Sequence, residues 1–194
     1  IDSFFKDELQ QILSNIVIRT TRKQVKKYIE FTDRIPHSEI LKPTDNEREL
    51  YDKITKIIQE KYEEGIEIFY LMIIQRLVSS SNDAAKHALK LMKKHEYVDQ
   101  MEYDELIEIS NRIKIDTKAI ELLKILEQQK DEKFLIFVEW RSTLAYLAKL
   151  LTKNGYTVTQ FYGDLNLFER NESVERFRGE TQIMISTSAG GYGQ

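Results

Sequence analysis

The stretch Phe134-Leu135-Ile136-Phe137-Val138 decides the fold of this chain. Its five consecutive apolar residues lack polar alternation, and such a run is typical of a strand buried on both faces of a parallel sheet. Two further strands are expected at Tyr156 to Phe161 and at Gln182 to Thr187, each after a helical segment. The order strand, helix, strand, helix, strand predicts an α/β unit: a parallel sheet flanked by helices.

The helix after the first strand offers a candidate phosphate site. In open parallel sheets ligands bind beyond the carboxyl ends of the strands, and this helix begins there, at Glu139-Trp140-Arg141. Free backbone N–H groups at its N-terminus, the Arg141 charge and the hydroxyls of Ser142 and Thr143 could all meet a phosphate. The alternative is that Ser142 only caps the helix.

The ends of the other two strands carry glycine. Strand two runs into Tyr162-Gly163-Asp164, where glycine permits a tight turn or a close ligand. Strand three runs into Ser186 to Gly193, whose last residues can lie against a phosphate or ribose, although a glycine-rich loop alone is a weak signal. Spacing rejects the serine-hydrolase elbow, the dinucleotide fingerprint and the P-loop here. No metal site is expected, because the three histidines are too scattered for a zinc motif.

The first half of the chain is mainly helical. Thr44-Asp-Asn-Glu47 has capping-box spacing and opens a helix, and Ile66 to Leu77 is so apolar that we expect a helix buried nearly all round. The acidic passage from Glu96 to Glu108 predicts a short helix and a surface loop. Asp116 is a good N-cap for the helix that delivers the chain to the first strand. The expected division is therefore 1–34, 35–112 and 113–194.

Composition limits the function classes. The chain has 194 residues, 41% hydrophobic and 31% charged, with a formal charge of −3 and no cysteine, which excludes disulfide frameworks and thiolate metal sites. No signal segment or membrane span is evident, so a cytoplasmic protein without a membrane partner is the default. One basic run stands out as either a solvated helix face or a phosphate-contacting patch. It comprises Arg19, Arg22, Lys23, Lys26 and Lys27.

Taken together, these segments resemble the superfamily-two nucleic-acid-dependent ATPases of the Swi/Snf type, particularly bacterial members related to the RNA-polymerase-recycling ATPase. The resemblance covers nearly the whole chain, and its motifs occur in the family's order. They are Ile18-Arg-Thr-Thr-Arg-Lys-Gln-Val25, Asp116-x-Lys118, Lys133-Phe-Leu-Ile-Phe-Val-Glu-Trp140, Tyr162-Gly163 with Glu169-Arg170, and Ile185-Ser-Thr-Ser-Ala-Gly-Gly-Tyr-Gly-Gln194. The last two resemble the family's motifs IV and V.

The resemblance implies a motor of two RecA-like lobes that closes on ATP and steps along a nucleic-acid backbone, more often duplex DNA. This chain would hold the end of lobe one, a helical insertion and an incomplete second lobe, mainly helical first and then a partial RecA-like parallel sheet. ATP and Mg would be bound mainly by the first lobe, whose motifs are absent here, so this piece alone is expected to be inactive.

The resemblance also implies roles for single residues. Arg141, Ser142, Gly163 and Thr187 would face nucleic-acid phosphates, while Trp140 could be either a nucleic-acid contact or a core residue. Three glycines would lie by the ATP cleft: Gly190, Gly191 and Gly193. Many family members have glutamine where Glu139 stands, and a carboxylate near phosphates is unfavourable, which leaves the role of Glu139 open.

A different class of function is a non-catalytic α/β binding or scaffold module whose helical half recruits a protein partner. The placement of the chain within a longer motor also predicts that an incomplete sheet leaves strand three or its neighbour with an unpaired edge, through which 182–187 could self-associate.

Overall fold

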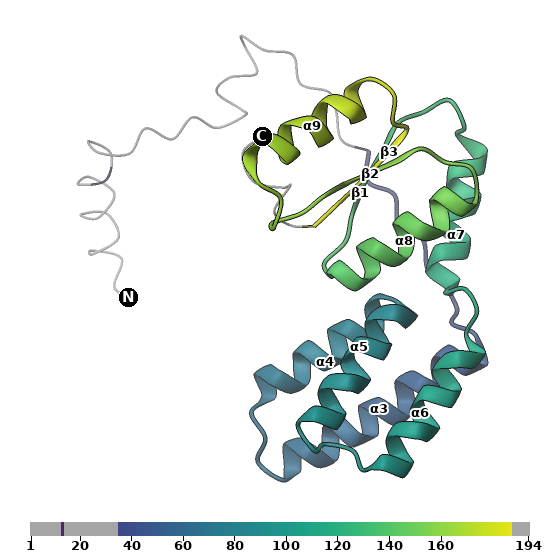
Figure 1. The fold of residues 1–194 in the computed structure, drawn as a ribbon. Helices are drawn as coiled ribbons and strands as arrows, with labels where there is room; N and C mark the ends of the chain where they lie inside the picture. Colours follow the sequence, from purple (N-terminus) through teal and green to yellow (C-terminus); the bar gives the residue numbers. More distant parts are fainter. Residues whose placement is uncertain (1–12, 14–34, 188–194) are drawn as a thin grey trace. The chain divides into compact units, whose positions relative to one another are not determined.

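The computed structural model describes residue 13 and residues 35–187, and the chain separates into two compact units, 1–40 and 41–194. Within the first unit, residues 35–40 have no regular secondary structure, as expected for a connector bounded by prolines. Every element discussed below belongs to the second unit (Figure 1). The predicted division at residues 34 and 112 remains a prediction.

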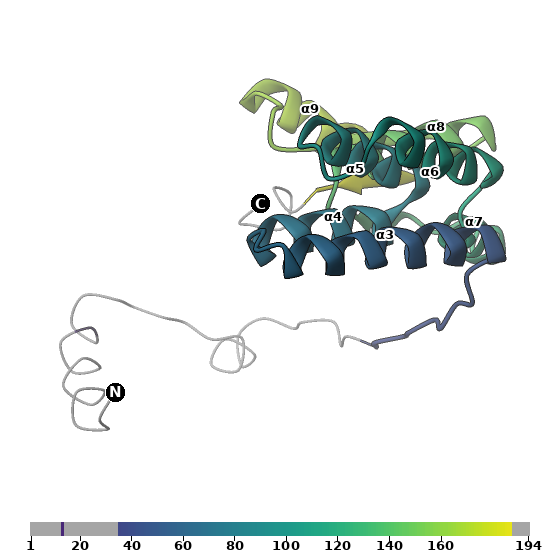
Figure 2. The same cartoon turned by 90° about the horizontal axis from the view of Figure 1, so that it is seen from below.

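Four helices form a bundle at the start of the second unit. They are α3 (Asp45–Glu63), α4 (Ile68–Ser80), α5 (Asn82–Lys94) and α6 (Gln100–Arg112). Each helix packs against two neighbours, α3 against α4 and α6, and α5 against α4 and α6 (Figure 2). Their shared core includes Leu50, Ile54, Leu77, Leu89, Met92, Leu106 and Ile109.

Local capping explains where these helices begin. Thr44 accepts a hydrogen bond from the Glu47 backbone N–H while Glu47 bonds back to the Thr44 N–H, so the predicted capping box is confirmed. The Ser81 hydroxyl accepts from the Ala84 N–H at the start of α5, and Asp99 caps α6. These side chains satisfy backbone donors that would otherwise lack partners in the first helical turn.

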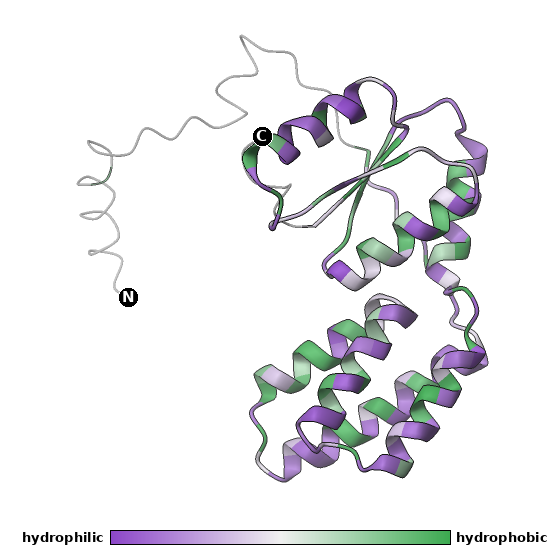
Figure 3. Ribbon diagram, in the orientation of Figure 1, coloured by the Kyte–Doolittle hydropathy of each residue, from purple (hydrophilic) through white to green (hydrophobic). Residues whose placement is uncertain are grey.

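One expectation for the bundle is wrong, although α4 is as apolar as the sequence suggests (Figure 3). Helix α4 is not buried all round: Leu71, Ile74 and Leu77 face the core, but Phe69 is 66% exposed, and Ile68, Tyr70 and Met72 are also exposed. A bundle helix buries only the stripe that faces its neighbours, however apolar the rest is. The acidic passage has the expected loop, at residues 96–99, and the expected helix, α6, which runs on to Arg112 because Leu106 and Ile109 anchor it to the core.

The sheet has three parallel strands in the order β1-β3-β2, with β1 at Phe134–Phe137, β2 at Val158–Phe161 and β3 at Ile183–Ser186. Phe137 and Phe161 both align with Ser186. Because both neighbours of β3 run parallel to it, all three strands end at the same edge. The predicted strand-helix alternation and the partial RecA-like α/β class are confirmed.

Three helices accompany the sheet. Helices α7 (Thr117–Gln128) and α8 (Arg141–Lys153) share a core with the face that carries Phe134, Ile136, Ile183 and Ile185. Helix α9 (Leu167–Arg178) packs against β2 and lies on the other side of the sheet from α8 (Figure 1). Asn166 caps it through a capping box with Glu169.

The expectation that β1 is buried on both faces is wrong. Leu135 is 49% and Phe137 56% exposed, whereas Phe134 and Ile136 on the alternate face are part-buried against α7 and α8. Among the described strands β1 is an edge strand, and α9 packs mainly against β2. Strand β3 is central and pairs on both sides, so 182–187 offers no free edge for the expected self-association. The unpaired edge expected at strand three or its neighbour lies instead on the neighbours β1 and β2 among the described strands.

Candidate functional site

The carboxyl ends of the three strands gather the predicted site residues. The Val138 N–H donates to the Ser186 carbonyl at 2.9 Å, and the Thr187 N–H donates to the Phe161 carbonyl at 3.0 Å. The backbone at Val138, Phe161 and Thr187 is therefore held in one row. The segments that follow β1 and β2 leave this row as two adjacent loops, 138–140 and 162–166.

Helix α8 begins at this edge with an open N-terminus. Trp140 is its N-cap residue and makes no side-chain capping bond, and the first helical bond runs from the Leu144 N–H to the Trp140 carbonyl. Ser142 lies inside the first turn, so the alternative in which Ser142 caps the helix does not hold. The N–H groups of residues 141–143 point out of the helix end, where the helix dipole favours an anion.

Arg141 and Tyr162 join the two loops. The guanidinium carbon of Arg141 lies 3.1 Å from the centroid of the Tyr162 ring, a cation–π stack that fixes the arginine at the end of β2. Both side chains come from residues that directly follow the row of strand ends. This geometry places a positive charge beside the open N-terminus of α8. The sequence placed Tyr162 directly after a strand but gave its side chain no role, and the structure supplies that role.

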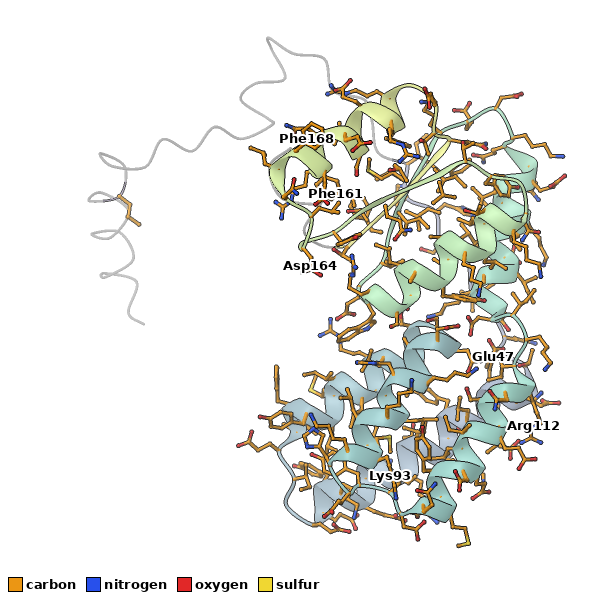
Figure 4. The ribbon with its side chains drawn as sticks, viewed as in Figure 1. Glu47, Lys93, Arg112, Phe161, Asp164 and Phe168 are labelled. Carbon is orange, nitrogen blue, oxygen red and sulfur yellow. The ribbon has the colours of Figure 1, made fainter. Side chains whose placement is uncertain are left out.

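The loop after β2 is braced by Arg170 of α9. Its Nη2 donates to the Gly163 carbonyl at 2.7 Å and its Nε to the Leu165 carbonyl at 2.9 Å. The guanidinium of Arg170 is therefore committed to the loop after β2. Gly163 itself is exposed, so its backbone remains open to a ligand, and Asp164 projects nearby (Figure 4).

Thr187 differs from the other predicted contacts in being buried. Its N–H is bonded to Phe161, and its carbonyl accepts from the Ser186 hydroxyl at 2.8 Å. Arg141, Ser142 and Gly163 thus present atoms at the strand ends, while Thr187 forms the floor of the site. The structure brings these four predicted residues to one edge of the sheet.

The loop before α8 is also fixed by the helical bundle. Trp140 packs against the bundle core with its indole Nε1 buried, which favours the core alternative over a nucleic-acid contact. Thr143 Oγ1 lies 2.8 Å from the hydroxyls of both Ser80 and Ser81. Glu139 forms an ion pair with Arg76 of α4. The partners of Thr143 and Glu139 lie more than 60 residues away in the sequence, so sequence reasoning did not find them.

A buried polar network connects the bundle to the start of α7. The Asn82 side chain donates to the Ser110 and Ile113 carbonyls at 2.9 and 3.1 Å and accepts from the Ser110 hydroxyl. Its backbone N–H donates to the Asp116 carboxylate at 2.7 Å. Burial raises the pKa of Asp116 above its ordinary value, although the Asn82 N–H opposes the shift.

The Asp116 side chain does not cap α7, contrary to expectation. Glu47 accepts from the Thr117 N–H instead, at 2.8 Å, and thereby links the capping box of α3 to the first turn of α7. Burial works to raise the pKa of Glu47, but hydrogen bonds from Thr117 and Thr44 outweigh it and leave that pKa below its ordinary value. The junction between bundle and sheet is therefore made of specific polar bonds.

Several predicted site residues lie outside the described part of the chain. These are the basic run Arg19, Arg22, Lys23, Lys26 and Lys27 and the glycines Gly190, Gly191 and Gly193. The described residues contain no phosphate loop of the P-loop type, and no cluster of three metal-ligand side chains occurs among them. They do not by themselves fit ATP with Mg. Over residues 35–187, no helix is long and apolar enough to cross a membrane.

Comparisons with known proteins agree with this geometry. Residues 117–194 match the family model described as the helicase conserved C-terminal domain. Residues 117–194 are therefore similar to helicase C-terminal domains. The match begins at the first residue of α7 and takes in the three described strands, so the strand-end site lies inside the matched region.

Curated relatives point the same way. The chain is 27% identical over 192 residues to the protein named "Uncharacterized ATP-dependent helicase YqhH" of Bacillus subtilis, covering 96% of this chain and 34% of that protein. It is 30% identical over 92 residues to the ATP-dependent RNA helicase DBP3 of Vanderwaltozyma polyspora, covering 46% of this chain and 17% of that protein. The chain thus spans about a third or less of the length of these relatives.

One solved structure supports the fold. The helicase domain of Hef from Pyrococcus furiosus aligns with a TM-score of 0.52 at 15% identity, covering 73% of this chain and 44% of that one. At that identity the likeness concerns the fold alone. It supports the partial RecA-like α/β fold of this chain.

Proposed function

We propose that this chain is part of an ATP-dependent nucleic-acid translocase of the Swi/Snf type, and that this piece supplies nucleic-acid backbone contacts and one side of the ATP cleft. The helicase C-terminal match and the names of the relatives support the motor class. The Swi/Snf assignment rests on the motif order of the sequence. ATP with Mg would be held mainly by a first RecA-like lobe of the same protein, and nucleotide hydrolysis would need both lobes.

The observation that carries the proposal is the position of Arg141. Its guanidinium is stacked on Tyr162 beside the open N-terminus of α8, at the carboxyl edge of a parallel sheet. Two sources of positive potential, a fixed side-chain charge and a helix dipole, therefore converge on one spot. A nucleic-acid phosphate is the ligand that such a spot suits, because contacts of this kind recognise the backbone without reading the bases.

Duplex DNA is the proposed substrate. The described residues present no helix arranged to read base edges, so binding should show little sequence preference and fall steeply with salt. Relatives include proteins named as RNA helicases, so the binding experiment should compare duplex DNA with duplex RNA of the same sequence. Tighter binding to RNA would refute the choice of DNA while leaving the motor class intact.

The test of the site is Arg141→Ala in the full-length protein, measured by fluorescence anisotropy with a labelled duplex. We expect affinity to fall about tenfold and the slope of log affinity against log salt to decrease in magnitude by about 1, as for one lost phosphate contact. The matched control is Arg178→Ala. Arg178 is exposed and its ion pair among the described residues is with Glu175, while the end of α9 that carries it bonds to Lys133, next to the amino end of β1. Equal losses in both variants, or none in either, would refute the proposed site.

The alternative function, recruitment of a protein partner by the bundle, is favoured by one observation. The side chains of Ile68, Phe69, Tyr70 and Met72, in the first turns of α4, are large, apolar and exposed. Phe69→Asp separates the two functions: loss of a partner at unchanged nucleic-acid affinity supports recruitment, and unchanged partners at unchanged affinity count against it.

A further inference from the structure

We infer that Arg76 of the helical bundle is a positioning residue for the nucleic-acid site, and that it acts by neutralising Glu139. This inference rests on the proposed function of the strand-end site and adds to it a residue of the bundle, which lies outside the helicase C-terminal match. It also explains how a carboxylate at position 139 can be tolerated close to a site for phosphates.

Glu139 is an acid in an unfavourable place. It stands immediately before the N-cap residue Trp140 and two residues before Arg141, so its charge lies close to the spot proposed for a phosphate. No hydrogen bond joins its side chain to the open N–H groups of α8 among the described residues, so it does not cap that helix. An unopposed carboxylate here would repel a phosphate and cancel part of the potential of Arg141 and the helix end.

Arg76 removes this charge. Its Nη2 lies 2.5 Å from Glu139 Oε1, and both side chains remain partly exposed, Arg76 at 60% and Glu139 at 42%. Because the pair faces solvent, it contributes little to the free energy of folding. A charge-assisted bond of this length nevertheless holds the carboxylate to the bundle and away from the end of α8.

Neighbouring contacts make the placement of Arg76 precise. One helical turn after Arg76, Ser80 and Ser81 bond to Thr143 in the first turn of α8, and Trp140 packs into the bundle core. Lys118 of α7 is occupied with the Ser79 carbonyl at 2.6 Å. Of the basic side chains described near this junction, Arg76 is the one paired with Glu139. The bundle therefore sets the charge of the site through Arg76.

The experiment is a double-mutant cycle in the full-length protein, with affinity and salt slope measured by anisotropy on a labelled DNA duplex. We expect Arg76→Ala to weaken binding about fivefold, because the free carboxylate then faces the phosphates. Glu139→Gln should bind at least as tightly as wild type. The double variant should return to within about twofold of wild type with an unchanged salt slope, and Arg76→Lys should stay near wild type.

A matched control is the pair Arg112 and Glu49, which is exposed to a similar degree and bonded at 3.0 Å elsewhere on the bundle. Arg112→Ala should leave the affinity unchanged. Equal effects of Arg112→Ala and Arg76→Ala would show a general loss of surface charge and overturn the inference.

Other outcomes also overturn it, each in a distinguishable way. Unchanged affinity in Arg76→Ala, while Arg141→Ala still weakens binding, rejects this inference alone. A double variant that stays weak with a slope smaller by about 1 identifies Arg76 as a direct phosphate contact instead. Weakened binding in Glu139→Gln shows that the ion pair matters for structure. A wild-type protein that does not bind the duplex overturns the proposed function and this inference with it.

Discussion

Asn82 holds the junction between bundle and sheet, and its replacement by alanine should loosen that junction locally. The variant loses three side-chain hydrogen bonds, two donated to the Ser110 and Ile113 carbonyls and one accepted from the Ser110 hydroxyl. The Ser110 carbonyl keeps a bond from the Ile113 N–H at 3.1 Å, whereas the Ile113 carbonyl loses the side-chain donor. The backbone bond from Asn82 to Asp116 remains available in the variant.

The expected cost follows from this inventory. Each buried hydrogen bond contributes about 1 kcal/mol net, and an orphaned buried group costs about 1 to 3 kcal/mol, so the local opening free energy should fall by about 3 kcal/mol. That difference corresponds to a roughly hundredfold faster amide exchange, since about 1.4 kcal/mol is a factor of ten. Hydrogen exchange followed by mass spectrometry should show it in peptides covering α5 and residues 110–117.

The control for this prediction is Asn154→Ala. The Asn154 side chain makes one hydrogen bond, to the Leu150 carbonyl at 2.8 Å, on the exposed end of α8. Its loss should cost less than about 0.5 kcal/mol, as is usual for surface positions. If exchange in Asn82→Ala is no faster than in this control, the polar network does not hold the junction and the reasoning fails.

Two further predictions concern stability. Burial raises the pKa of Asp116 above its ordinary value of 3.8, so its contribution to stability is most favourable at low pH and is lost as pH rises through the folded-state pKa. The stability of Asp116→Asn relative to wild type should therefore increase between about pH 3 and pH 7 in denaturant titrations, and a flat difference would contradict the assignment. Lys133 Nζ donates to the carbonyls of residues 177–179, so Lys133→Met should cost about 1 to 2 kcal/mol by fraying the end of α9. Thermal unfolding tests this against Lys149→Met, an exposed lysine of α8, and equal losses would disprove it.

Local signals in the sequence predicted local structure well. The capping box at Thr44, the cap at Ser81 and the start of α9 at Asn166 all depend on atoms within three residues of one another. The alternation of strands and helices was likewise readable, because each run of apolar residues is short and bounded by turn residues.

Burial was predicted less well, because it depends on neighbours that the sequence does not reveal. The apolar run in β1 indicates a strand with two covered faces, yet α9 packs against β2 and leaves Leu135 and Phe137 exposed. The same error was made for α4. Its apolar residues lie all round the helix, but only those on the side of the bundle core are buried. An apolar run indicates what a segment can bury, whereas the fold decides which part it does bury.

The candidate site was found in outline from the sequence, because the carboxyl ends of parallel strands are a general place for ligands. Its supporting partners were not found. Glu47 with Thr117, Arg76 with Glu139 and Ser80 with Thr143 each join residues more than 60 positions apart. Such pairs have no spacing rule, so only the fold reveals them.

The strand order β1-β3-β2 has a consequence for how the protein is made. Of the three described strands, the one made last is the central one, so β1 and β2, which do not pair with each other, have no partner among them until Ile183–Ser186 has emerged. The four helices of the bundle lie within residues 45–112, so they can begin to pack earlier in synthesis. A nascent chain that pauses before residue 183 would therefore carry a folded bundle beside two open strands, and chaperone capture should concentrate on that interval of translation.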